Sequence, residues 1–327
     1  MTDNISNFSL NDITGNVIRP FQLESSSLRG RIVRFDDVLD SILDAHDYPE
    51  IVSQLLAETI TLCALLSSML KYEGIFTLQT SGDGPISMLV ADMTSEGHIR
   101  GCASFDAERV KKMEKDIVKS DAPLMLLLGK GYIAFTVDQG DETDRYQGIV
   151  ELRGKSLVEC VQHYFEQSEQ IDTGIKLAVG RQEGDWRAAG IMLQQMPDEG
   201  GAQVDKGVKA PPISNREEDD WERALIFLES CKDAELLAPE LHGHDILIRL
   251  FHEEGVRVYE PLELSHQCRC SQEKVERIVR MMPDEEREDM AKDDDLSMTC
   301  EFCSHKYILS PDIVKPNEDT PSDDLAV

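Results

Sequence analysis

The sequence predicts an α+β protein that combines a large N-terminal mixed α/β domain with a mostly antiparallel sheet, a helical linker and a small C-terminal domain. Three observations predict this architecture. Short strand-like segments joined by hairpin-length connections fill roughly the first 195 residues, which favours antiparallel pairing. A stretch with glycines, prolines and charges follows and leads into amphipathic helices. Two close pairs of cysteines then lie near the C-terminus, in the most acidic region of the chain.

The domain limits follow from changes in composition along the 327 residues. Residues 1–196 form the N-terminal α+β domain, and residues 197–261 form the linker with its amphipathic helices. Residues 262–310 contain both cysteine pairs. Residues 311–327 form an acidic tail with too few apolar residues to fold, and we expect it to be disordered.

The first domain is expected to contain a strand at 29–35, a helix at 36–46 and a longer helix at 49–72. Pro49 suits the first turn of the longer helix, and Gly74 suits a stop just beyond its end. Apolar residues spaced by three and four share one face of that helix, and they are Leu55, Thr59, Leu62, Leu66 and Met69.

Most of the rest of this domain is predicted to be strand. The expected strands are at 75–80, 86–93, 98–105, 124–129, 132–138, 146–152, 175–180 and 187–195. A helix at 156–170 interrupts them, with Ser156 as its N-cap and Glu159 three residues later, which is the pattern of a capping box.

The linker is predicted to begin with an irregular stretch at 197–220 and to continue as helices at 221–231 and 244–254. The apolar residues of the second helix are too few for an independent core, so we expect this helical segment to lie on another part of the protein. Two short helices are expected further on, at 272–281 and 283–290.

The formal net charge of −30 at pH 7 excludes several classes of partner. Nucleic-acid binding depends on Lys and Arg that neutralise phosphates, so we expect no nucleic-acid partner and no binding to anionic membranes. The sequence has no run of about 18 apolar residues and no apolar or basic start of the secretory kind. We therefore expect a cytoplasmic protein with no membrane partner, whose cysteines are reduced.

Four of the eight cysteines form two pairs, Cys268 with Cys270 and Cys300 with Cys303, separated by 29 residues. Two short pairs at such a distance match the general form of a four-thiolate zinc site, because each pair supplies two ligands from one turn. The sequence therefore predicts that these four cysteines hold one zinc ion. The unit around them is short and acidic, so we expect its fold to depend on the metal.

The first pair suggests that the site can be dismantled. Only one residue separates Cys268 from Cys270, and extended chain places their α-carbons about 6.6 Å apart, near the upper limit for a disulfide. A disulfide there would need a bend, and strained disulfides tend to be labile and regulatory. Oxidation would consume the thiolates, so the metal and the folding free energy that it supplies would be lost together. A purely structural zinc unit is the alternative on spacing alone.

The other candidate residues have simpler interpretations. His266 and His305 flank the cysteine pairs, but with four cysteines available we expect them to be exposed or to contact the ligands. "GKG" at 129–131 is expected to be a turn, and no GxxxxGK[ST] phosphate loop occurs. No convincing set of nucleophile, base and orienting residue is present, so we do not expect an enzyme. Four cysteines in apolar patterns are expected to be buried and inert, namely Cys63, Cys102, Cys160 and Cys231.

"CRC" followed after 29 residues by "CEFC" resembles the zinc site of the heat-shock protein 33 family, the redox-regulated 33 kDa chaperonins. The resemblance follows the order of the family across roughly residues 25 to 310. It extends to "TLQTSGDGPISMLVAD" (77–92), "IRGCASF" (99–105), "RYQGIVELRGKSLVECVQHYFEQSEQ" (145–170) and "LIRLFHEEGVRVYEP" (247–261).

The resemblance implies an ATP-independent chaperone, a holdase that binds unfolding or oxidatively damaged proteins and prevents their aggregation under oxidative stress. The reduced form, with zinc bound at the four cysteines, would be inactive. Oxidation would form the disulfides Cys268–Cys270 and Cys300–Cys303, release the zinc and unfold the C-terminal domain and the linker. The active form would be a homodimer. Until then, the helical segment at 221–254 would cover apolar surface on the sheet of the first domain.

Two alternatives stay open. One is a zinc-stabilised adaptor protein without a redox response. The other is a thiol–disulfide oxidoreductase that uses Cys300 and Cys303, which would need a CxxC at the start of a helix in a thioredoxin-like setting. The chain departs from the family in a longer stretch around 200–214 and in its extended tail after Pro311, which affects the domain limits and not the four cysteines.

Overall fold

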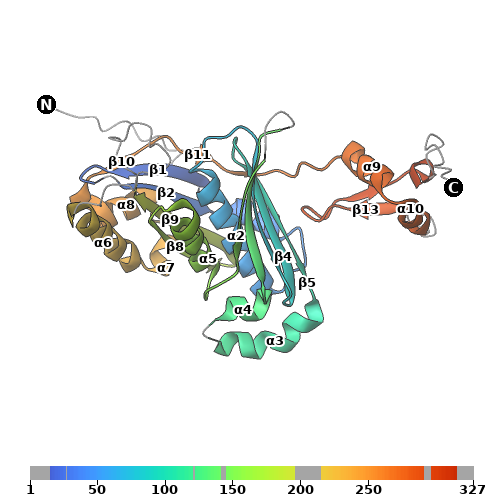
Figure 1. The fold of residues 1–327 in the computed structure, drawn as a ribbon, viewed down its shortest axis with the longest axis horizontal. Helices are drawn as coiled ribbons and strands as arrows, with labels where there is room; N and C mark the ends of the chain where they lie inside the picture. Colours follow the sequence, from blue (N-terminus) through green and yellow to red (C-terminus); the bar gives the residue numbers. More distant parts are fainter. Residues whose placement is uncertain are drawn as a thin grey trace, which may run out of the picture. The chain divides into compact units, whose positions relative to one another are not determined.

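The computed structural model describes residues 15–26, 28–120, 122–140, 145–195, 215–290 and 296–314. The chain divides into two compact units, unit 1 from Met1 to Gln267 and unit 2 from Cys268 to Val327. Figure 1 shows the helices and strands of both units. Most of the predicted irregular stretch and of the predicted acidic tail lies outside the described residues, so the domain limits stay predictions. The described parts differ from the prediction, because residues 215–220 are helical and residues 311–314 form a 3₁₀ turn in which Ile313 is buried.

Unit 1 contains two six-stranded sheets, which confirms the α+β class and its antiparallel pairing, although the sequence analysis predicted one sheet. In sheet A all strands pair antiparallel in the order β10-β1-β2-β9-β8, and a short β11 also pairs with β1. Its strands are β1 (Val17–Leu23), β2 (Leu28–Phe35), β8 (Thr173–Gln182), β9 (Asp185–Gln195), β10 (Val256–Val258) and β11 (Leu262–Glu263).

Sheet B has the strand order β12-β5-β4-β3-β6-β7. Every pairing is antiparallel except that of β12 with β5, which is parallel. Its strands are β3 (Ile75–Gly82), β4 (Ile86–Thr94), β5 (His98–Phe105), β6 (Gly131–Asp138), β7 (Tyr146–Glu151) and β12 (Ser265–His266).

Helix α2 (Glu50–Ser67) packs against strands of both sheets and is buried on nearly all sides. The sequence analysis predicted a single buried face, but Ile60 and Leu65, which lie off that face, are completely buried as well. Two glycines permit this close packing. A Cβ on Gly101 of β5 would lie 3.0 Å from Ile60 Cγ1, and one on Gly190 of β9 would lie 2.9 Å from Leu65 Cδ1. The helix therefore joins both sheets into one core.

The predicted strand at 124–129 is wrong, because these residues form the helix α4. Leu124, Leu127 and Leu128 are its buried residues, and their spacing of three and four is helical and not alternating. "GKG" consequently joins a helix to β6 and does not connect two strands. The remaining helices of this region are α1 (Asp37–Leu43), α3 (Ala107–Lys119), α4 (Pro123–Leu128), α5 (Leu157–Tyr164) and the π-helical turn η2 (Phe165–Glu169).

The predicted N-cap of α5 is confirmed, with a difference in detail. The Ser156 hydroxyl accepts a hydrogen bond from the Glu159 backbone N–H at 3.2 Å. The Glu159 carboxylate accepts from the Lys155 backbone N–H at 2.7 Å, one residue before the N-cap. The helix start is therefore held from both sides, as a capping box would hold it.

Three helices of the predicted linker cover sheet A, as Figure 1 shows. They are α6 (Asn215–Ser230), α7 (Asp233–Leu236) and α8 (Gly243–Phe251). Successive residues of β2 point to opposite faces, so Val33 belongs to the core around α2 while Ile32 packs with these helices. Phe251 is completely buried and its ring stacks on Phe21 of β1 at 6.2 Å. The expectation that the helical segment lies on the first domain is confirmed.

An extended segment follows this helical cover, after the short 3₁₀ turn η3 (His252–Glu254). It first adds β10 and β11 to β1 of sheet A. It then adds β12 to β5 of sheet B, where the Gln267 N–H donates to the Ile99 carbonyl at 3.3 Å. The sequence does not predict these strands, because each has only two or three residues. The segment occupies one edge of each sheet immediately before Cys268.

Unit 2 is small, and its described part has a core of only four buried hydrophobic residues, Val275, Val279, Leu309 and Ile313. The predicted helices at 272–281 and 283–290 are confirmed. The elements of unit 2 are α9 (Gln272–Met281), α10 (Asp284–Met290), β13 (Ser297–Thr299), β14 (Lys306–Ile308) and the 3₁₀ turn η4 (Pro311–Val314). Strands β13 and β14 form an antiparallel hairpin.

By length and composition, α2 is the one described helix that could cross a membrane, but 78% of it is buried inside the protein. The core helix of a globular domain passes the same test, so this helix is explained by its place between the sheets.

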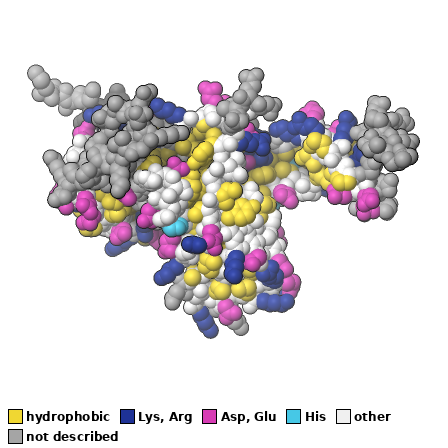
Figure 2. Space-filling model, in the orientation of Figure 1, with side chains coloured by type: hydrophobic (Ala, Val, Ile, Leu, Met, Phe, Trp, Pro, Cys, Tyr) yellow, Lys and Arg dark blue, Asp and Glu magenta, His cyan; other side chains and the backbone are white. Residues whose placement is uncertain are grey.

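On the face that Figure 2 presents, acidic and basic side chains are interspersed with hydrophobic ones.

Glu58 gives unit 1 a pH-dependent stability. Burial raises the pKa of this carboxyl on α2 from 4.5 to about 7. The folded state therefore holds the proton more tightly than the unfolded chain, and stability is lost as the pH rises through this range. We expect Glu58→Gln to raise the melting temperature at pH 8 by at least about 2–4 °C, the equivalent of about 1 kcal/mol, and by much less at pH 5.

Tryptophan fluorescence can follow this transition, because both tryptophans, Trp186 and Trp221, belong to unit 1. Glu73→Gln is the matched control, since Glu73 is exposed. Equal gains from Glu58→Gln at both pH values would contradict the assignment.

Candidate metal centre

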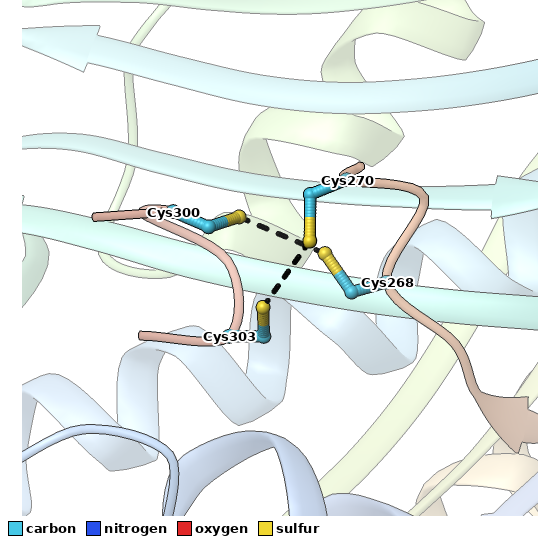
Figure 3. A group of neighbouring side chains, drawn as sticks. All are labelled: Cys268, Cys270, Cys300 and Cys303. Carbon is cyan, nitrogen blue, oxygen red and sulfur yellow. Dashed lines mark hydrogen bonds between the residues drawn. The ribbon is translucent and has the colours of Figure 1, made fainter. Parts of the chain in front are cut away.

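The four cysteines predicted as ligands converge in unit 2, as Figure 3 shows. Their sulfur atoms all lie within 4.8 Å of one another. Cys268 Sγ is 3.7 Å from Cys300 Sγ, and Cys270 Sγ is 3.5 Å from Cys303 Sγ. Zinc–sulfur bonds of about 2.3 Å in a tetrahedron give sulfur separations of about 3.8 Å. The four sulfurs could therefore hold one metal ion, and all four cysteines are free thiols.

The first pair lies in the loop before α9. Ser271 caps this helix, because its hydroxyl accepts from the Lys274 N–H at 3.3 Å. The ammonium group of Lys274 donates to the Arg269 carbonyl at 2.6 Å. These two bonds bend the chain around Arg269, so both flanking sulfurs, of Cys268 and Cys270, reach the same centre.

The second pair lies in the turn between β13 and β14. The Cys300 N–H donates to the His305 carbonyl at 2.9 Å, and the Ser304 N–H donates to the Cys300 carbonyl at 2.9 Å. Ser304 has a φ of 55°, in the left-handed region, which closes the turn tightly. Gln272 of α9 donates to the Ile308 carbonyl at 3.1 Å and so ties the first pair's helix to this hairpin.

The protein alone does not favour thiolates in this cluster. Burial raises the pKa of Cys300, and it raises the pKa of Cys303 to about 12. Thiols are ligands only when deprotonated, so a divalent cation has to supply the charge that stabilises four sulfur anions at this distance. The donor set, four soft sulfurs within 4.8 Å of one another, is that of zinc or an iron–sulfur centre.

Tyr307 is a further contributor that the sequence analysis missed. Its hydroxyl donates to Cys270 Sγ at 3.0 Å, and its ring packs edge-on against His305 at 4.6 Å. Hydrogen bonds to metal-ligating atoms orient the ligands and adjust their charge. A signal was present in the sequence, since Tyr307 lies four residues after Cys303 in an alternating strand, but only the hairpin shows that it reaches the other cysteine pair.

The two flanking histidines differ from each other in position. His305 follows the second pair and contacts Tyr307, whereas His266 belongs to β12 of unit 1. Burial lowers the pKa of His266. Neither histidine belongs to the metal-competent group of described residues.

The other four cysteines are buried, as predicted. Burial raises the pKa of Cys160 and that of Cys231, which disfavours their reactive thiolate forms. The setting of Cys300 and Cys303 also differs from that of an oxidoreductase. Their CxxC forms the turn of a β-hairpin and does not begin a helix, so no helix dipole lowers a thiol pKa there.

The chain thus combines an α+β body with a small unit in which four cysteines could hold a metal ion. The family model described as Hsp33 protein matches residues 16–310. The 33 kDa chaperonin of Caulobacter vibrioides is 36% identical over 304 residues, which cover 91% of this chain and 96% of that protein. The 33 kDa chaperonin of Escherichia coli is 33% identical over 291 residues, covering 89% and 90%. The chain belongs to the Hsp33 family.

A solved structure agrees with this fold. The crystal structure of the 33 kDa chaperonin from Thermotoga maritima is similar to this chain with a TM-score of 0.72. It covers 92% of this chain and 97% of its own, at 23% sequence identity.

Removal of the metal should unfold unit 2 and leave the core of unit 1 around α2 intact. Four buried hydrophobic residues cannot offset the conformational entropy of this unit, whereas apparent metal binding contributes roughly 10–16 kcal/mol in zinc-finger peptides. We expect one zinc per chain in the reduced protein. A chelator under reducing conditions should abolish amide protection in unit 2 while tryptophan emission from the core of unit 1 is retained.

Metal content by mass spectrometry and amide hydrogen exchange measure these outcomes. Cys268→Ser should lose most of the zinc, and Cys102→Ala, which removes a buried thiol outside the cluster, should keep it. Protection of unit 2 that survives complete loss of metal would contradict this dependence.

Proposed function

We propose that this chain is a holdase, an ATP-independent chaperone that is inactive while zinc is bound to reduced cysteines and active after their oxidation. Its membership of a family whose relatives are named 33 kDa chaperonins supports the chaperone activity. We infer the redox switch from one observation. Four sulfurs lie within 4.8 Å of one another in a unit whose described residues include a core of four buried hydrophobic side chains.

Oxidation would act directly on the ligands. Formation of each disulfide removes two electrons from two cysteines, and one molecule of peroxide accepts them and is reduced to water. Two disulfides therefore consume two molecules of peroxide. We propose the pairs Cys268–Cys270 and Cys300–Cys303, each within one turn of chain. In the reduced cluster the sulfurs of both motifs are mutual neighbours, so the pairing follows the family resemblance and not the distances. Sulfurs in disulfides are no longer ligands, and the metal's contribution to folding is lost.

Unfolding of unit 2 would affect unit 1 through the covalent connection between Gln267 and Cys268. Gln267, the last residue bonded to sheet B, directly precedes Cys268. The segment before it contributes only two or three residues to each pairing with β1 and β5. Such short edge pairings are weak on their own, so they are the first contacts of unit 1 to open when unit 2 no longer restrains the chain.

The helical cover lies immediately before this segment. Its release would expose the apolar face of sheet A, which includes Phe21, Ile32, Ile191 and Leu193. A broad apolar surface without a defined pocket suits unfolding proteins of many sequences. The high net negative charge of −30 would keep the opened protein soluble.

The roles of the segments follow from this order. We assign client binding and dimerisation to residues 1–196, the releasable cover to 197–261, and the redox switch to 262–310. The oxidised form would be a homodimer, and the protein would act in the cytoplasm on clients damaged by oxidative stress. This function involves no catalysis, nucleic acid or membrane.

Light scattering of a heat-unfolding client tests the proposal. Protein treated with peroxide and mild heat should suppress aggregation at about one chain per client, and reduced zinc-loaded protein should not. Cys102→Ala should behave like the parent, whereas a variant with all four cluster cysteines replaced by serine should no longer respond to peroxide. Peroxide control that persists in this variant would end the proposal. Retention of zinc after oxidation, with no protection, would point to the adaptor instead.

Phe251→Ala should separate the cover from the switch. Removing this buried ring costs about 3–5 kcal/mol and weakens the packing of α8 on sheet A. We expect partial client protection without oxidation, while one zinc per chain is still bound. In a Trp186→Phe background, the emission of Trp221 on α6 should shift to the red.

Ile248→Ala is the matched control, because Ile248 lies on the same helix and is 43% exposed. It should leave the reduced protein inactive. A Phe251→Ala protein with an opened cover and no protective activity would show that sheet A is not the client surface.

A further inference from the structure

Unit 1 contains a cavity of about 520 Å³ that the proposed switch does not use. The end of α2, strands β2, β3, β6 and β7, and the turn η2 all contribute to its lining. Small-molecule sites have volumes of about 300–1,000 Å³ and combine an apolar wall with a few polar groups. Here the apolar wall includes Leu66, Met69, Phe76, Phe135, Val137 and Phe165.

A ring of three polar side chains forms one side of this cavity. The hydroxyls of Tyr146 and Tyr164 each lie 2.7 Å from Glu169 Oε1, to which they donate. The two hydroxyls are 2.9 Å apart. Two phenol donors thus hold one oxygen of the Glu169 carboxylate on this side of the cavity.

An unusual backbone makes this ring. Tyr164 and Glu169 are five residues apart, and in an α-helix such residues point in directions roughly 140° apart. The π-helical turn η2 (Phe165–Glu169), whose hydrogen bonds join residues five apart, brings them to one side. Gln170 ends the turn with a φ of 54° in the left-handed region. Such turns are rare and cluster at functional sites, and this one lies within the "YFEQSEQ" segment at 164–170.

The facing strand is adapted to the ring as well. A Cβ on Gly148 of β7 would lie 2.4 Å from the Tyr164 hydroxyl oxygen. Any larger residue at Gly148 would therefore push Tyr164 away from Tyr146 and Glu169. The ring of Tyr164 also packs on Phe135, the residue of β6 that pairs with Gly148, at 4.5 Å between ring centroids.

Cationic side chains line the cavity as well. Arg29, Arg31 and Lys71 contribute to the lining, against the single acidic residue Glu169, so the charged lining residues sum to +2 in a protein of net charge −30. Two backbone carbonyls fix Arg31, which donates to Ser68 at 3.3 Å and to Gly30 at 2.8 Å. Burial and the neighbouring charge of Arg29 lower the pKa of Arg31, so an anion beside them would be stabilised.

We propose that this cavity binds a small carboxylate with an apolar body, with the carboxylate at Arg29 and Arg31 and the body along Phe76 and Phe135. A guanidinium group can bind a carboxylate through two parallel hydrogen bonds, which fixes its orientation. A neutral apolar ligand would offer the guanidinium groups no charged hydrogen-bond acceptor, and a cation would be repelled by them. The lining therefore selects both the charge and the apolar character of the ligand.

Calorimetric titration of the reduced, zinc-loaded full chain with decanoate, below its micelle concentration, tests this site. Decanoate should bind at least ten times more tightly than 1-decanol or decyltrimethylammonium. Arg29→Gln together with Arg31→Gln should weaken decanoate binding at least tenfold. Tyr164→Phe should weaken it several-fold, since it disrupts the ring that shapes the cavity.

Arg153→Gln is the matched control, because Arg153 is exposed and pairs with Glu151. It should leave decanoate binding unchanged. If the double variant does not fold, Arg29→Gln and Lys71→Gln, both at exposed positions, give the same comparison. Equal binding of decanoate and decanol, or decanoate binding unaffected in the arginine variants, would overturn the proposal. Because these titrations involve no oxidation, their outcome is independent of the redox switch.

Discussion

The burial of α2 between two sheets is the constraint on which unit 1 depends. A helix with one polar face would leave one sheet exposed, but α2 is apolar around most of its circumference and so requires a sheet on each side. Gly101 and Gly190 then allow both sheets to approach it closely. Since sheet A also alternates inward and outward residues, its second face is apolar and needs a cover of its own. The helices α6, α7 and α8 provide that cover.

Unit 2 differs from unit 1 in how few apolar contacts its described part contains. Its core contains few buried side chains, and short backbone and side-chain bonds around four sulfurs determine its shape. Stability in unit 1 is spread over many contacts, whereas we propose that in unit 2 it is concentrated at the four cysteines. On that proposal, a reagent that modifies the four sulfur atoms would unfold unit 2 and leave the core of unit 1 unaffected. This difference in how stability is distributed is what makes a chemical switch at the C-terminal end physically reasonable.

The extended segment at 255–267 runs from the helical cover of sheet A to Cys268 of unit 2. It adds strands to both sheets, yet each pairing is too short to persist without help from its flanks. The cavity beside η2 lies in the same unit but has a different origin. There, a π-helical turn and a glycine place two phenols and a carboxylate together, and strand β2 contributes the arginines. Unit 1 thus combines an apolar sheet face under a helical cover with a preformed cavity.

The cysteine spacing predicted the four-cysteine cluster, because two short pairs can converge whatever their surroundings. Local patterns also determined α2, α5, α9 and most long strands, since periodicity and capping act within a few residues. The predicted strand at 124–129 failed although its leucines had helical spacing, and β10, β11 and β12 are too short to carry a pattern.

Only the tertiary structure decided the division into two sheets, the contact of Tyr307 with Cys270, and the meeting of Arg31 with Tyr164 around one cavity. These features join residues far apart in the chain or depend on which strand edges pair. A single sequence records the identities of such residues but not their distances, and it is the distances that give them their chemistry.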